Sequence, residues 1–470
     1  MPTPPSGPPV PVPPTTTTRA VVPPDLDALR AALDGALVTR GETDYDTVRR
    51  SYNPLLDKRE PLAVASPSTA DHVKACIESA AASALPIAAR SGGHSYAGYS
   101  TPDRGLVVDL AAMADIEVRD DGTAVVGAGA RLIDVYTALA ERGRMIPAGT
   151  CPSVGIGGLT LGGGLGVLSR KYGLTCDNLV GATVVTADSR QLGVSAEEEP
   201  DLFWGLRGGG GGNFGIVTDF TFATHPIPDE LSYFRLDFAP GAVAEALGAW
   251  QEWVAGAPPE LWSNLVVVGG SPPRGRVSGC FVGPRSRLEG LLDGLAATPA
   301  NRLVREGDFL DVVVHFAGCG SLAACAPSRA PREAFAASSR VLAAPTDPGR
   351  LVAQVDGRDG MDLLIDSLGG AIAEVGPAET AFPHREALAT VQIYQEATAE
   401  AAASASRAVA EVRDALARDG LSGGYVNYIE SAMPDWGIMY YGDNVNRLRD
   451  TAKRYDPDNV FAFAQGLAKA

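Results

Sequence analysis

Four glycine-rich loops in the first half of the chain limit what it can fold into. They lie at residues 91–93, 155–158, 162–166 and 208–215. Glycine lets backbone N–H groups approach a phosphate or a flat ring without obstruction by a Cβ atom. Because the loops are separate in sequence, they indicate an extended ligand that combines a pyrophosphate with a planar head group. FAD fits that description.

Two reactive side chains lie in or beside such loops. His94 ends the run Arg90-Ser-Gly-Gly-His94, and Cys151 lies in Gly149-Thr-Cys-Pro-Ser-Val-Gly155. An imidazole and a thiol placed where backbone can close on a ligand suggest two covalent anchors for one cofactor. On its own, a loop histidine can equally cap backbone groups, and a single cysteine more often fills an apolar core.

The spacing of apolar residues divides the chain into two kinds of structure. Residues 25–225 mix helices and strands, with helical patterns at 25–37, 68–77 and 131–141 and strand patterns at 105–110, 123–127, 179–186 and 214–222. After Pro226 the pattern changes to alternating strands at 232–238, 261–268, 276–282 and 389–396, interleaved with Ala-rich helices such as 399–417. This second pattern is typical of an antiparallel sheet covered by helices on one face. We therefore predict an α+β fold, with loops and one helix after Tyr425.

Charge and terminal composition restrict the partners and the location. The chain has 56 acidic and 39 basic residues among 470, a net charge of −17 that would repel a phosphate backbone, so we expect no nucleic-acid partner. No run approaches the roughly 18 apolar residues of a membrane helix, so we expect no membrane association. Residues 1–24 are rich in Pro and Thr and predict a disordered tail. They lack the features of a signal peptide, and both a cytoplasmic and a secreted location stay open.

Two motif matches point to functions that the local pattern does not support. Gly210-x-Gly212-x-x-Gly215 matches a dinucleotide fingerprint, but a strand pattern follows it where a helix is required. Gly420-x-Ser422-x-Gly424 matches a hydrolase elbow, but it lies in an expected helix-to-strand turn. The six cysteines and five histidines show no metal-ligand spacing, so no metal site is predicted. Cys319 and Cys325 could form a disulfide or stay free.

Longer motifs resemble a known flavoprotein family. The chain contains Ala89-Arg-Ser-Gly-Gly-His-Ser95, a run from Gly149 to Gly166, Arg170-Lys-Tyr-Gly-Leu-Thr-Cys-Asp-Asn-Leu179, Leu202-Phe-Trp-Gly-Leu-Arg-Gly-Gly209, Asn213-Phe-Gly-Ile-Val-Thr218, Thr380-Ala-Phe-Pro-His-Arg385, Tyr425-Val-Asn-Tyr428, Tyr441-Gly-Asp-Asn444 and Tyr455-Asp-Pro-Asp-Asn-Val-Phe461. In this order they resemble the berberine-bridge-enzyme-like flavin oxidases of the vanillyl-alcohol-oxidase group. The resemblance implies a two-part PCMH-type FAD-binding domain at 25–227, a substrate domain at 228–424 and a C-terminal segment, 425–470, that returns to the FAD domain.

The resemblance assigns cofactor contacts residue by residue. It implies that His94 bonds the flavin 8α-methyl carbon and that Cys151 bonds flavin C6. The further contacts that it implies are Arg90, Ser91, Gly92, Gly93 and Ser95 around the pyrophosphate, Gly163, Gly164 and Gly166 near the isoalloxazine, Gly155 and Gly158 in the adjoining glycine loop, Asp177, Asn178, Gly215, Ile216 and Val217 on the adenosine side, and Tyr441 and Asn444 from the C-terminal segment. Any of these glycines could instead serve tight packing.

The same resemblance implies hydride transfer to the flavin coupled to removal of a hydroxyl proton. Tyr428 is the predicted base, and its pKa would have to be lowered by a basic neighbour or a second phenol. Glu430, two residues later, is expected on the same face if the stretch is extended, either as the base or to orient it. Gln392 and Tyr394 share one face of the 389–396 strand and could line the pocket, although ordinary sheet packing explains Tyr394 equally well. Family members often carry an aromatic residue where this chain has Leu165.

The substrate is the least constrained part of the prediction. An alcohol is expected, either a sugar or a secondary metabolite, with O2 as the electron acceptor and H2O2 as a product. Oxidative C–C or C–N chemistry and an oxygen-insensitive dehydrogenase are the alternatives. The chain is expected to act as a monomer or a homodimer. Four aromatic residues could stack on a sugar or pack in the core: Trp250, Trp253, Trp262 and Phe335.

Overall fold

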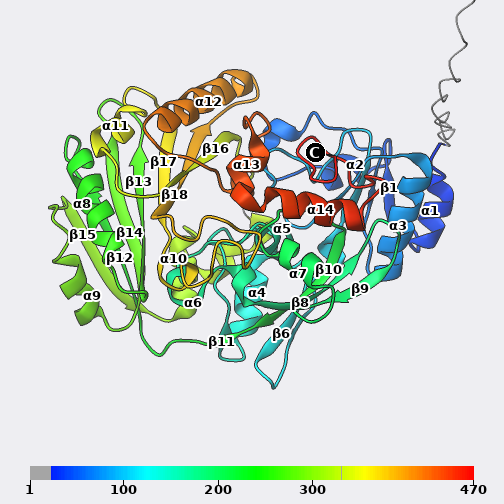
Figure 1. Ribbon diagram of the computed structural model, residues 1–470, viewed down its shortest axis with the longest axis horizontal. Coiled ribbons are helices and arrows are strands. Elements are labelled where there is room, and N and C mark those ends of the chain that lie inside the picture. Colours follow the sequence, from blue (N-terminus) through cyan, green and yellow to red (C-terminus); the bar gives the residue numbers. More distant parts are fainter. Residues whose placement is uncertain (1–22, 330, 470) are drawn as a thin grey trace, which may run out of the picture.

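A computed structural model describes residues 23–329 and 331–469 (Figure 1). The predicted tail, 1–24, falls almost wholly outside the described residues. The chain forms a first half with two main sheets and a second half built on one large sheet. Within the described part of the chain, no helix is long and apolar enough to cross a membrane.

The first sheet holds the strand that leads into the His94 loop. Its order is β1 (Leu37–Thr39), β2 (Ala63–Ala65), β4 (Leu106–Asp109) and β3 (Ile87–Arg90). β4 pairs parallel with both β2 and β3, and β1 pairs antiparallel with β2. Helix α3 (Ala70–Ser83) starts where Thr69 accepts a hydrogen bond from the backbone of His72 at 3.2 Å, as its capping sequence predicts. Because β3 ends at Arg90, the loop that follows leaves from the edge of this sheet.

The second sheet is antiparallel and carries the strand after the fourth glycine loop. Its order is β5 (Ile116–Val118), β6 (Thr123–Gly127), β10 (Ile216–Ala223), β8 (Leu179–Val185) and β9 (Gln191–Val194). The predicted strand after Gly215 is confirmed as β10, so the Gly210–Gly215 run does not open a helix. The short elements around these two sheets are α1 (Leu26–Ala32), α2 (Tyr45–Val48), α4 (Leu132–Ala140), α5 (Ile156–Leu161), α6 (Ser169–Tyr172), α7 (Pro200–Leu206) and the pair β7 (Arg144–Met145) and β11 (His225–Pro226). The predicted helical stretch 25–37 stops at Ala32, and β1 begins at Leu37.

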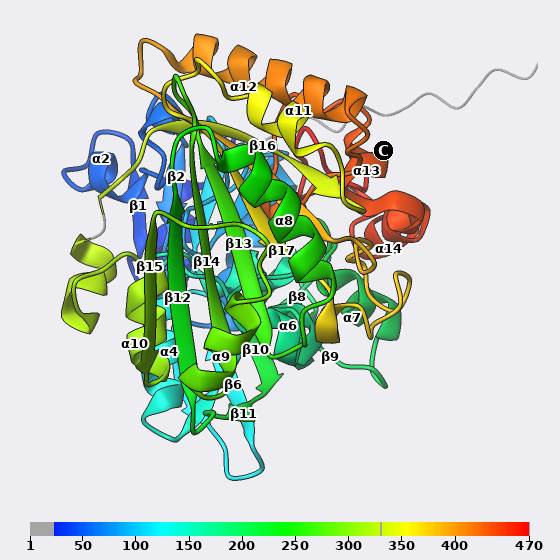
Figure 2. The ribbon, with the colours of Figure 1, turned by 90° about the vertical axis from the view of Figure 1, so that its left-hand side faces the viewer.

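A seven-stranded antiparallel sheet forms the second half (Figure 2). Its order is β15 (Asn301–Gly307), β12 (Leu231–Phe238), β14 (Arg274–Val282), β13 (Leu261–Val268), β17 (Met361–Ser367), β18 (Ala389–Glu396) and β16 (Phe335–Leu342). The strands at 301–307, 335–342 and 361–367 were not predicted from the sequence. The antiparallel sheet and its helical cover confirm the predicted α+β class.

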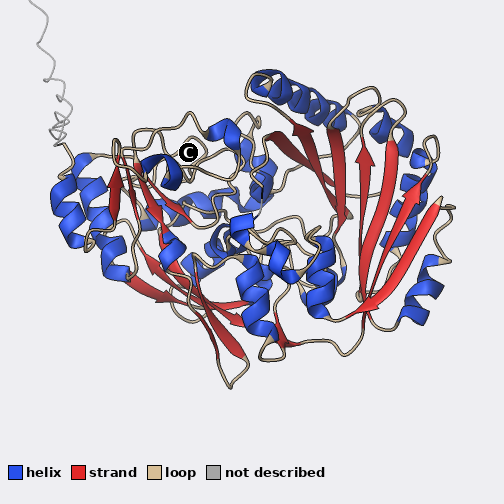
Figure 3. Cartoon of the chain, turned by 180° about the vertical axis from the view of Figure 1, so that it is seen from behind, coloured by secondary structure: helices blue, strands red, loops and turns tan. Residues whose placement is uncertain are grey.

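Helices cover one face of this sheet, and the other face is turned toward the first half (Figure 3). The covering helices are α8 (Val243–Ala255), α9 (Arg285–Leu292), α11 (Pro348–Ala353) and α12 (Ala402–Arg418). Trp250 on α8 is fully buried and donates to Ser263 Oγ at 3.0 Å. Side chains alternate along a strand, so Ser263 marks the helix-covered face of β13, and its neighbours Trp262 and Asn264 face the other way.

The C-terminal segment packs back on the first half (Figure 1). It holds two helices, α13 (Trp436–Tyr441) and α14 (Val445–Tyr455), where one was predicted. Tyr441 donates to Gly209 O at 3.0 Å, and the side chain of Asn213 accepts from Leu467 N at 3.1 Å.

A short helix, α10 (Phe309–Phe316), follows β15 and ends near the disulfide between Cys319 and Cys325. Ser422 follows α12 but forms only an isolated bridge with Val341, so the predicted strand after it is absent from this described stretch.

Candidate active site

One cavity of about 1390 Å³ joins the glycine loops to the uncovered face of the seven-stranded sheet. The first half contributes the loops at 91–96, 149–158 and 210–217. The second half contributes alternate residues of β12, β14, β13, β17 and β18. A ligand held by the loops would therefore present one end to the sheet.

The His94 and Cys151 loops meet through two glycines. A Cβ atom at Gly92 would lie 2.1 Å from Gly155 N, and one at Gly155 would lie 2.0 Å from Ser91 Oγ. No side chain fits at such distances, so glycine at both positions is what allows the two backbones to touch. His94 Nε2 and Ser153 Oγ are 3.1 Å apart, which links the imidazole to the second loop. The two reactive groups predicted as anchors are therefore brought to the same cavity.

His94 is held as a neutral imidazole. Burial, and then the positive charge of Arg131, lower its pKa to about 3. Its ring stacks on Tyr52 with the centroids 4.0 Å apart. A neutral ring in a fixed orientation has a free nitrogen lone pair, as bonding to a carbon atom requires.

Cys151 lines the same cavity as a free thiol that is exposed to it. Burial among the surrounding groups, followed by the negative charge of Glu333, raises the pKa of Cys151. Tyr52 and Tyr96 line the same cavity, and burial, followed by neighbouring negative charges that include a Cys151 thiolate, raises the pKa of both phenols. Cys151 therefore lines the same cavity as His94 and as Tyr52, on which the His94 ring stacks.

Most of the predicted cofactor residues line the cavity. Those that do are Ser91, Gly92, Gly93, His94, Ser95, Cys151, Gly155, Gly158, Gly166, Gly215, Ile216, Val217 and Tyr441. Those that do not are Arg90, Gly163, Gly164, Asp177, Asn178 and Asn444. Such a set of loops, open toward the cavity and rich in backbone N–H groups, suits a flavin with its pyrophosphate.

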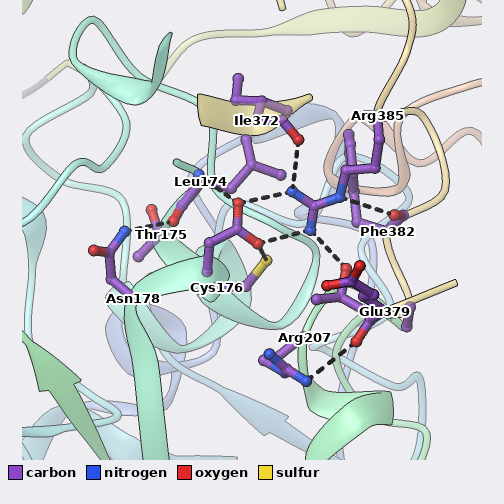
Figure 4. A network of polar contacts seen from close by, with 12 residues as sticks. Leu174, Thr175, Cys176, Asn178, Arg207, Ile372, Glu379, Phe382 and Arg385 are labelled. Carbon is purple, nitrogen blue, oxygen red and sulfur yellow. Dashed lines mark hydrogen bonds and ion pairs between the residues drawn. The ribbon is translucent and has the colours of Figure 1, made fainter. Parts of the chain in front are cut away.

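Asp177 forms a buried ion pair with Arg385, whose hydrogen bonds are drawn in Figure 4. Both of its carboxylate oxygens accept from the Arg385 guanidinium at 2.7 Å. Asn178 donates to Tyr172 O and Leu174 O, both at 2.9 Å. These two side chains stabilise the turn before β8 and its contact with the 370–385 segment. Neither lines the cavity, and their predicted adenosine contact stays a prediction.

The other four predicted contacts away from the cavity also have structural partners. The Arg90 guanidinium pairs with Asp109 at 2.6 Å and donates to Arg49 O at 3.1 Å. Gly164 N donates to Tyr425 Oη at 2.9 Å, and Asn444 donates to Pro377 O at 2.7 Å. Gly163, at φ +122°, packs beside Phe382. The packing alternative holds for both glycines.

Tyr428, the predicted base, lines the cavity between two other tyrosine side chains, Tyr96 and Tyr425. Its ring stacks on Tyr96 at 5.6 Å and meets Tyr425 edge-on at 5.0 Å. Burial, followed by the charge of Asp366, holds the pKa of Tyr428 well above its usual value. The prediction that a neighbour lowers this pKa is wrong, because both adjacent phenols raise it too.

Asp366 is the functional candidate that the sequence prediction missed. It lies on β17, lines the cavity, and is close enough to Tyr428 for its charge to act on that phenol. Burial raises the pKa of Asp366 to about 6, although a hydrogen bond from Asn264 lowers it. The strand Met-Asp-Leu-Leu-Ile-Asp-Ser places Asp362 and Asp366 on one face, and this period-two pattern was the signal that could have found them.

Glu430 lies outside the cavity, which corrects its predicted role. The stretch is a 3-10 turn at Val426–Tyr428 and is not extended, so Glu430 does not share a face with Tyr428. Its carboxylate pairs with Arg413 at 2.5 Å and accepts from Ser338 Oγ at 2.6 Å.

Gln392 does line the cavity, where it donates to Tyr96 Oη at 2.8 Å. Tyr394 lines it as well and stacks on Phe335 at 4.9 Å.

The four aromatic residues considered for stacking divide in two. Trp262 and Phe335 line the cavity. Trp250 lies in the helix-covered core, and Trp253 donates to Leu291 O at 2.8 Å. Only the first two can reach a ligand in this cavity.

Comparison with known proteins decides the family. A family model described as FAD binding domain matches residues 61–195, and one described as Berberine and berberine like matches residues 424–468. The chain is 33% identical to the FAD-linked oxidoreductase YgaK of Bacillus subtilis over 93% of this chain and 98% of that protein. This chain belongs to the berberine-bridge-enzyme-like family.

Other members of this family resemble the chain over nearly its whole length. The chitooligosaccharide oxidase of Gibberella zeae is 33% identical over 95% of this chain and 96% of its own. The structure of BBE-like 1 from Physcomitrella patens superposes with a TM-score of 0.88 at 28% identity, covering 93% of this chain and 98% of that one. A structure of a chitooligosaccharide oxidase gives a TM-score of 0.84 at 31% identity, over 94% and 99%. The predicted family, fold and FAD cofactor are confirmed, and the protein is an FAD-linked oxidoreductase.

Proposed function

We propose that this berberine-bridge-enzyme-like protein is a carbohydrate oxidase whose FAD is bonded to both His94 and Cys151. The observation that carries the proposal is a shared cavity: the two anchors, Tyr428 and Asp366 all line it. Similarity over 95% of the chain to a protein named chitooligosaccharide oxidase supports a sugar as the substrate. An FAD held by His94, Cys151 and the glycine loops would supply the acceptor for a hydride from the carbinol carbon, with O2 as the final electron acceptor and H2O2 as the product.

The chain's own groups supply the proton acceptor. Tyr428 Oη takes the proton of the reacting hydroxyl while its own proton passes to Asp366. A phenol with a raised pKa is a poor free base, so it needs a partner that accepts its proton as the reaction proceeds. With a pKa of about 6, Asp366 is mainly ionised at neutral pH and can fill that role. Gln392 fixes Tyr96, which stacks on Tyr428 and keeps its ring in place.

Two covalent bonds suit a cavity that is open at the sheet. They would hold the ring in one position without a lid over it and would raise its reduction potential. The neutral His94 imidazole and the nearby Cys151 thiol support this attachment, and the contact between Gly92 and Gly155 fixes the two loops on each other.

Anaerobic reduction of the bound flavin tests the function. Purified protein would be mixed without oxygen with a panel of neutral oligosaccharides and simple alcohols, and bleaching of the flavin band would be followed. We expect oligosaccharides to bleach it and air to restore it with release of H2O2. Restoration only by an artificial electron acceptor would make the protein a dehydrogenase. If the simple alcohols bleach the flavin and no oligosaccharide does, the carbohydrate assignment is wrong.

A further inference from the structure

A group of basic and unpaired polar side chains lines the cavity beside the proposed reaction centre and extends away from it along the sheet. Its members are Arg235, Trp262, Asn264, Arg276 and His315, which we call the basic corner. They come from β12, β13, β14 and α10, and none of them belongs to the glycine loops that suit the cofactor. The positive charges of Arg235 and Arg276 contrast with the chain as a whole, which carries a net charge of −17.

Three atoms of the basic corner are buried without a hydrogen-bond partner. They are Trp262 Nε1, Asn264 Oδ1 and Arg276 Nε. Leaving a buried donor or acceptor unpaired costs stability, so three such atoms facing one space indicate that something else pairs with them. Two of the three atoms are donors, and one of these donors is cationic.

Arg276 is the side chain best placed to bind an anion. No carboxylate of the described residues lies within 4.0 Å of its guanidinium, whereas the neighbouring Arg235 pairs with Asp237 at 2.9 Å. Asp362 lines the same side of the cavity, but its carboxylate accepts from Gly269 N at 3.1 Å. Burial, followed by the charge of Arg235, lowers the pKa of Arg276, although the carboxylates of Asp237 and Asp362 partly offset this. A bound anion would relieve that repulsion.

His315 lies on the other side of the same corner. Burial lowers its pKa, and the positive charges of Arg305, Arg235 and Arg276 lower it further. Its ring packs on Tyr233 at 4.4 Å. Two arginines and the neutral imidazole of His315 therefore converge, with the carboxylates of Asp237 and Asp362 beside them. Arg276, which forms no ion pair within the described residues, is the group of the corner that can bind an anion.

The register of the sheet sets how far the basic corner lies from the reaction centre. Asp366 pairs with Asn264, which pairs with Ser278 in register with Arg235, and Arg276 is two residues from Ser278 on the same face. β14 is two strands from β17, about 10 Å at ~4.8 Å per strand, and the two-residue offset along β14 adds about 7 Å at a right angle, so Arg276 lies about 12 Å from Asp366. That separation exceeds one sugar ring and reaches the ring that follows it.

We infer that the substrate is an acidic oligosaccharide, in which a uronic-acid carboxylate on the ring next to the oxidised one binds Arg276 and the donors around it. This rests on the proposed carbohydrate oxidation and narrows it to a substrate class. Arg276 Nε and a terminal nitrogen form a fork that matches a carboxylate. Trp262 Nε1 and Asn264 Oδ1, which lack partners on the strand between Arg276 and Asp366, would pair with sugar hydroxyls.

A matched pair of disaccharides tests the inference. Cellobiose and cellobiouronic acid differ only in the C6 group of the non-reducing ring. With the wild-type holoenzyme we expect kcat/KM to be about 10- to 100-fold higher for the acid, because hydrogen bonds to charged groups contribute in that range. Most of the difference should lie in KM, since the carboxylate is remote from the reacting carbon.

Two variants complete the test. Arg276→Met should bring the two kcat/KM values within about threefold of each other, because it lowers that of the acid far more than that of cellobiose. Arg274→Met removes an exposed arginine from the same strand, outside the cavity, and should leave the preference unchanged. Arg276→Lys, which keeps the charge but loses the fork, should fall between them and covers the case in which the Met variant does not fold.

Binding measured without turnover separates this inference from the proposed function. The shift of the flavin absorbance on titration with each disaccharide reports occupancy of the oxidised enzyme. Tight binding of the acid without bleaching would overturn the oxidation of these sugars and keep the acidic specificity. Equal or tighter binding of cellobiose, no binding of either sugar, or a preference that survives in Arg276→Met would overturn the inference.

Discussion

Replacing Arg385 with methionine should destabilise the protein strongly, because the change strands a buried carboxylate. The Arg385 side chain is 0% exposed and that of Asp177 is 9% exposed. The two are joined by two hydrogen bonds of 2.7 Å, and Arg385 also donates to Thr380 at 2.6 Å (Figure 4). In the variant, Asp177 keeps only the backbone N–H of Leu174 and the weak thiol contact of Cys176.

The magnitude follows from how such pairs behave when one partner is lost. Leaving one charge of a buried pair alone costs about 3–5 kcal/mol, whereas an exposed pair contributes about 0–1 kcal/mol. Arg190 and Asp188 provide the matched exposed control, since their side chains are 58% and 53% exposed at 2.6 Å. Urea titration at neutral pH would compare the free energies of unfolding of the wild type, Arg385→Met and Arg190→Met.

A double variant separates the stranded charge from lost packing. Asp177→Asn in the Arg385→Met background removes the buried charge, so it should recover at least half of the loss. A loss below about 1 kcal/mol in Arg385→Met, equal to that of Arg190→Met, would refute the reasoning. Asp177→Asn alone also tests the predicted adenosine contact of this residue: folded protein should retain one flavin per chain, and a loss of flavin without a loss of stability would support that contact.

The remaining predictions concern the loop contact and proton transfer. Gly92→Ala forces a Cβ atom to within 2.1 Å of Gly155 N, so most purified chains should lack flavin, and a wild-type ratio of flavin to protein absorbance would contradict the loop contact. Tyr428→Phe should lower kcat by about 100-fold or more with the flavin spectrum intact, and a near-normal rate would exclude Tyr428 as the proton acceptor. Because the folded pKa of Asp366 is raised to about 6, the carboxylate is protonated below that pH, so kcat/KM should fall as the pH drops through 6; a wild-type profile that is flat there would rule out its role. Asp366→Asn should be slow and should lack this acid limb.

The cofactor loops could be predicted because the chemistry is local in sequence. A glycine next to a histidine or a cysteine is visible in a run of six or seven residues, and the order of those runs identified the family. The structure adds why the glycines are needed: Gly92 and Gly155 touch each other, although they are 63 positions apart.

Two ion pairs could not be predicted because the partners are distant in sequence. Asp177 follows a family motif, but Arg385, which pairs with it, lies 208 positions away. Glu430 was placed beside Tyr428 on the assumption of an extended backbone, and a 3-10 turn sends it to Arg413 instead. Neither pairing leaves a mark in the local sequence.

The substrate side of the cavity was the hardest to predict for a related reason. Asp366, Arg276 and Trp262 line one cavity only because β17, β13 and β14 are neighbours in the sheet. The strand that contains Asp366 is not predicted by the sequence. Alternation along one strand can say that Asp362 and Asp366 share a face, but not which face meets the cavity. The order of the strands decides that, and it follows from packing over the whole half.

Intact mass after denaturation tests the proposed double attachment most directly. Wild-type protein, unfolded in acid and freed of small molecules, should exceed the mass of the bare chain by one FAD. His94→Ala and Cys151→Ala should each keep the FAD through the remaining bond, and the double variant should lose it. A wild-type mass equal to that of the bare chain would contradict covalent attachment altogether, and complete loss of FAD from either single variant would show that only one of the two bonds exists.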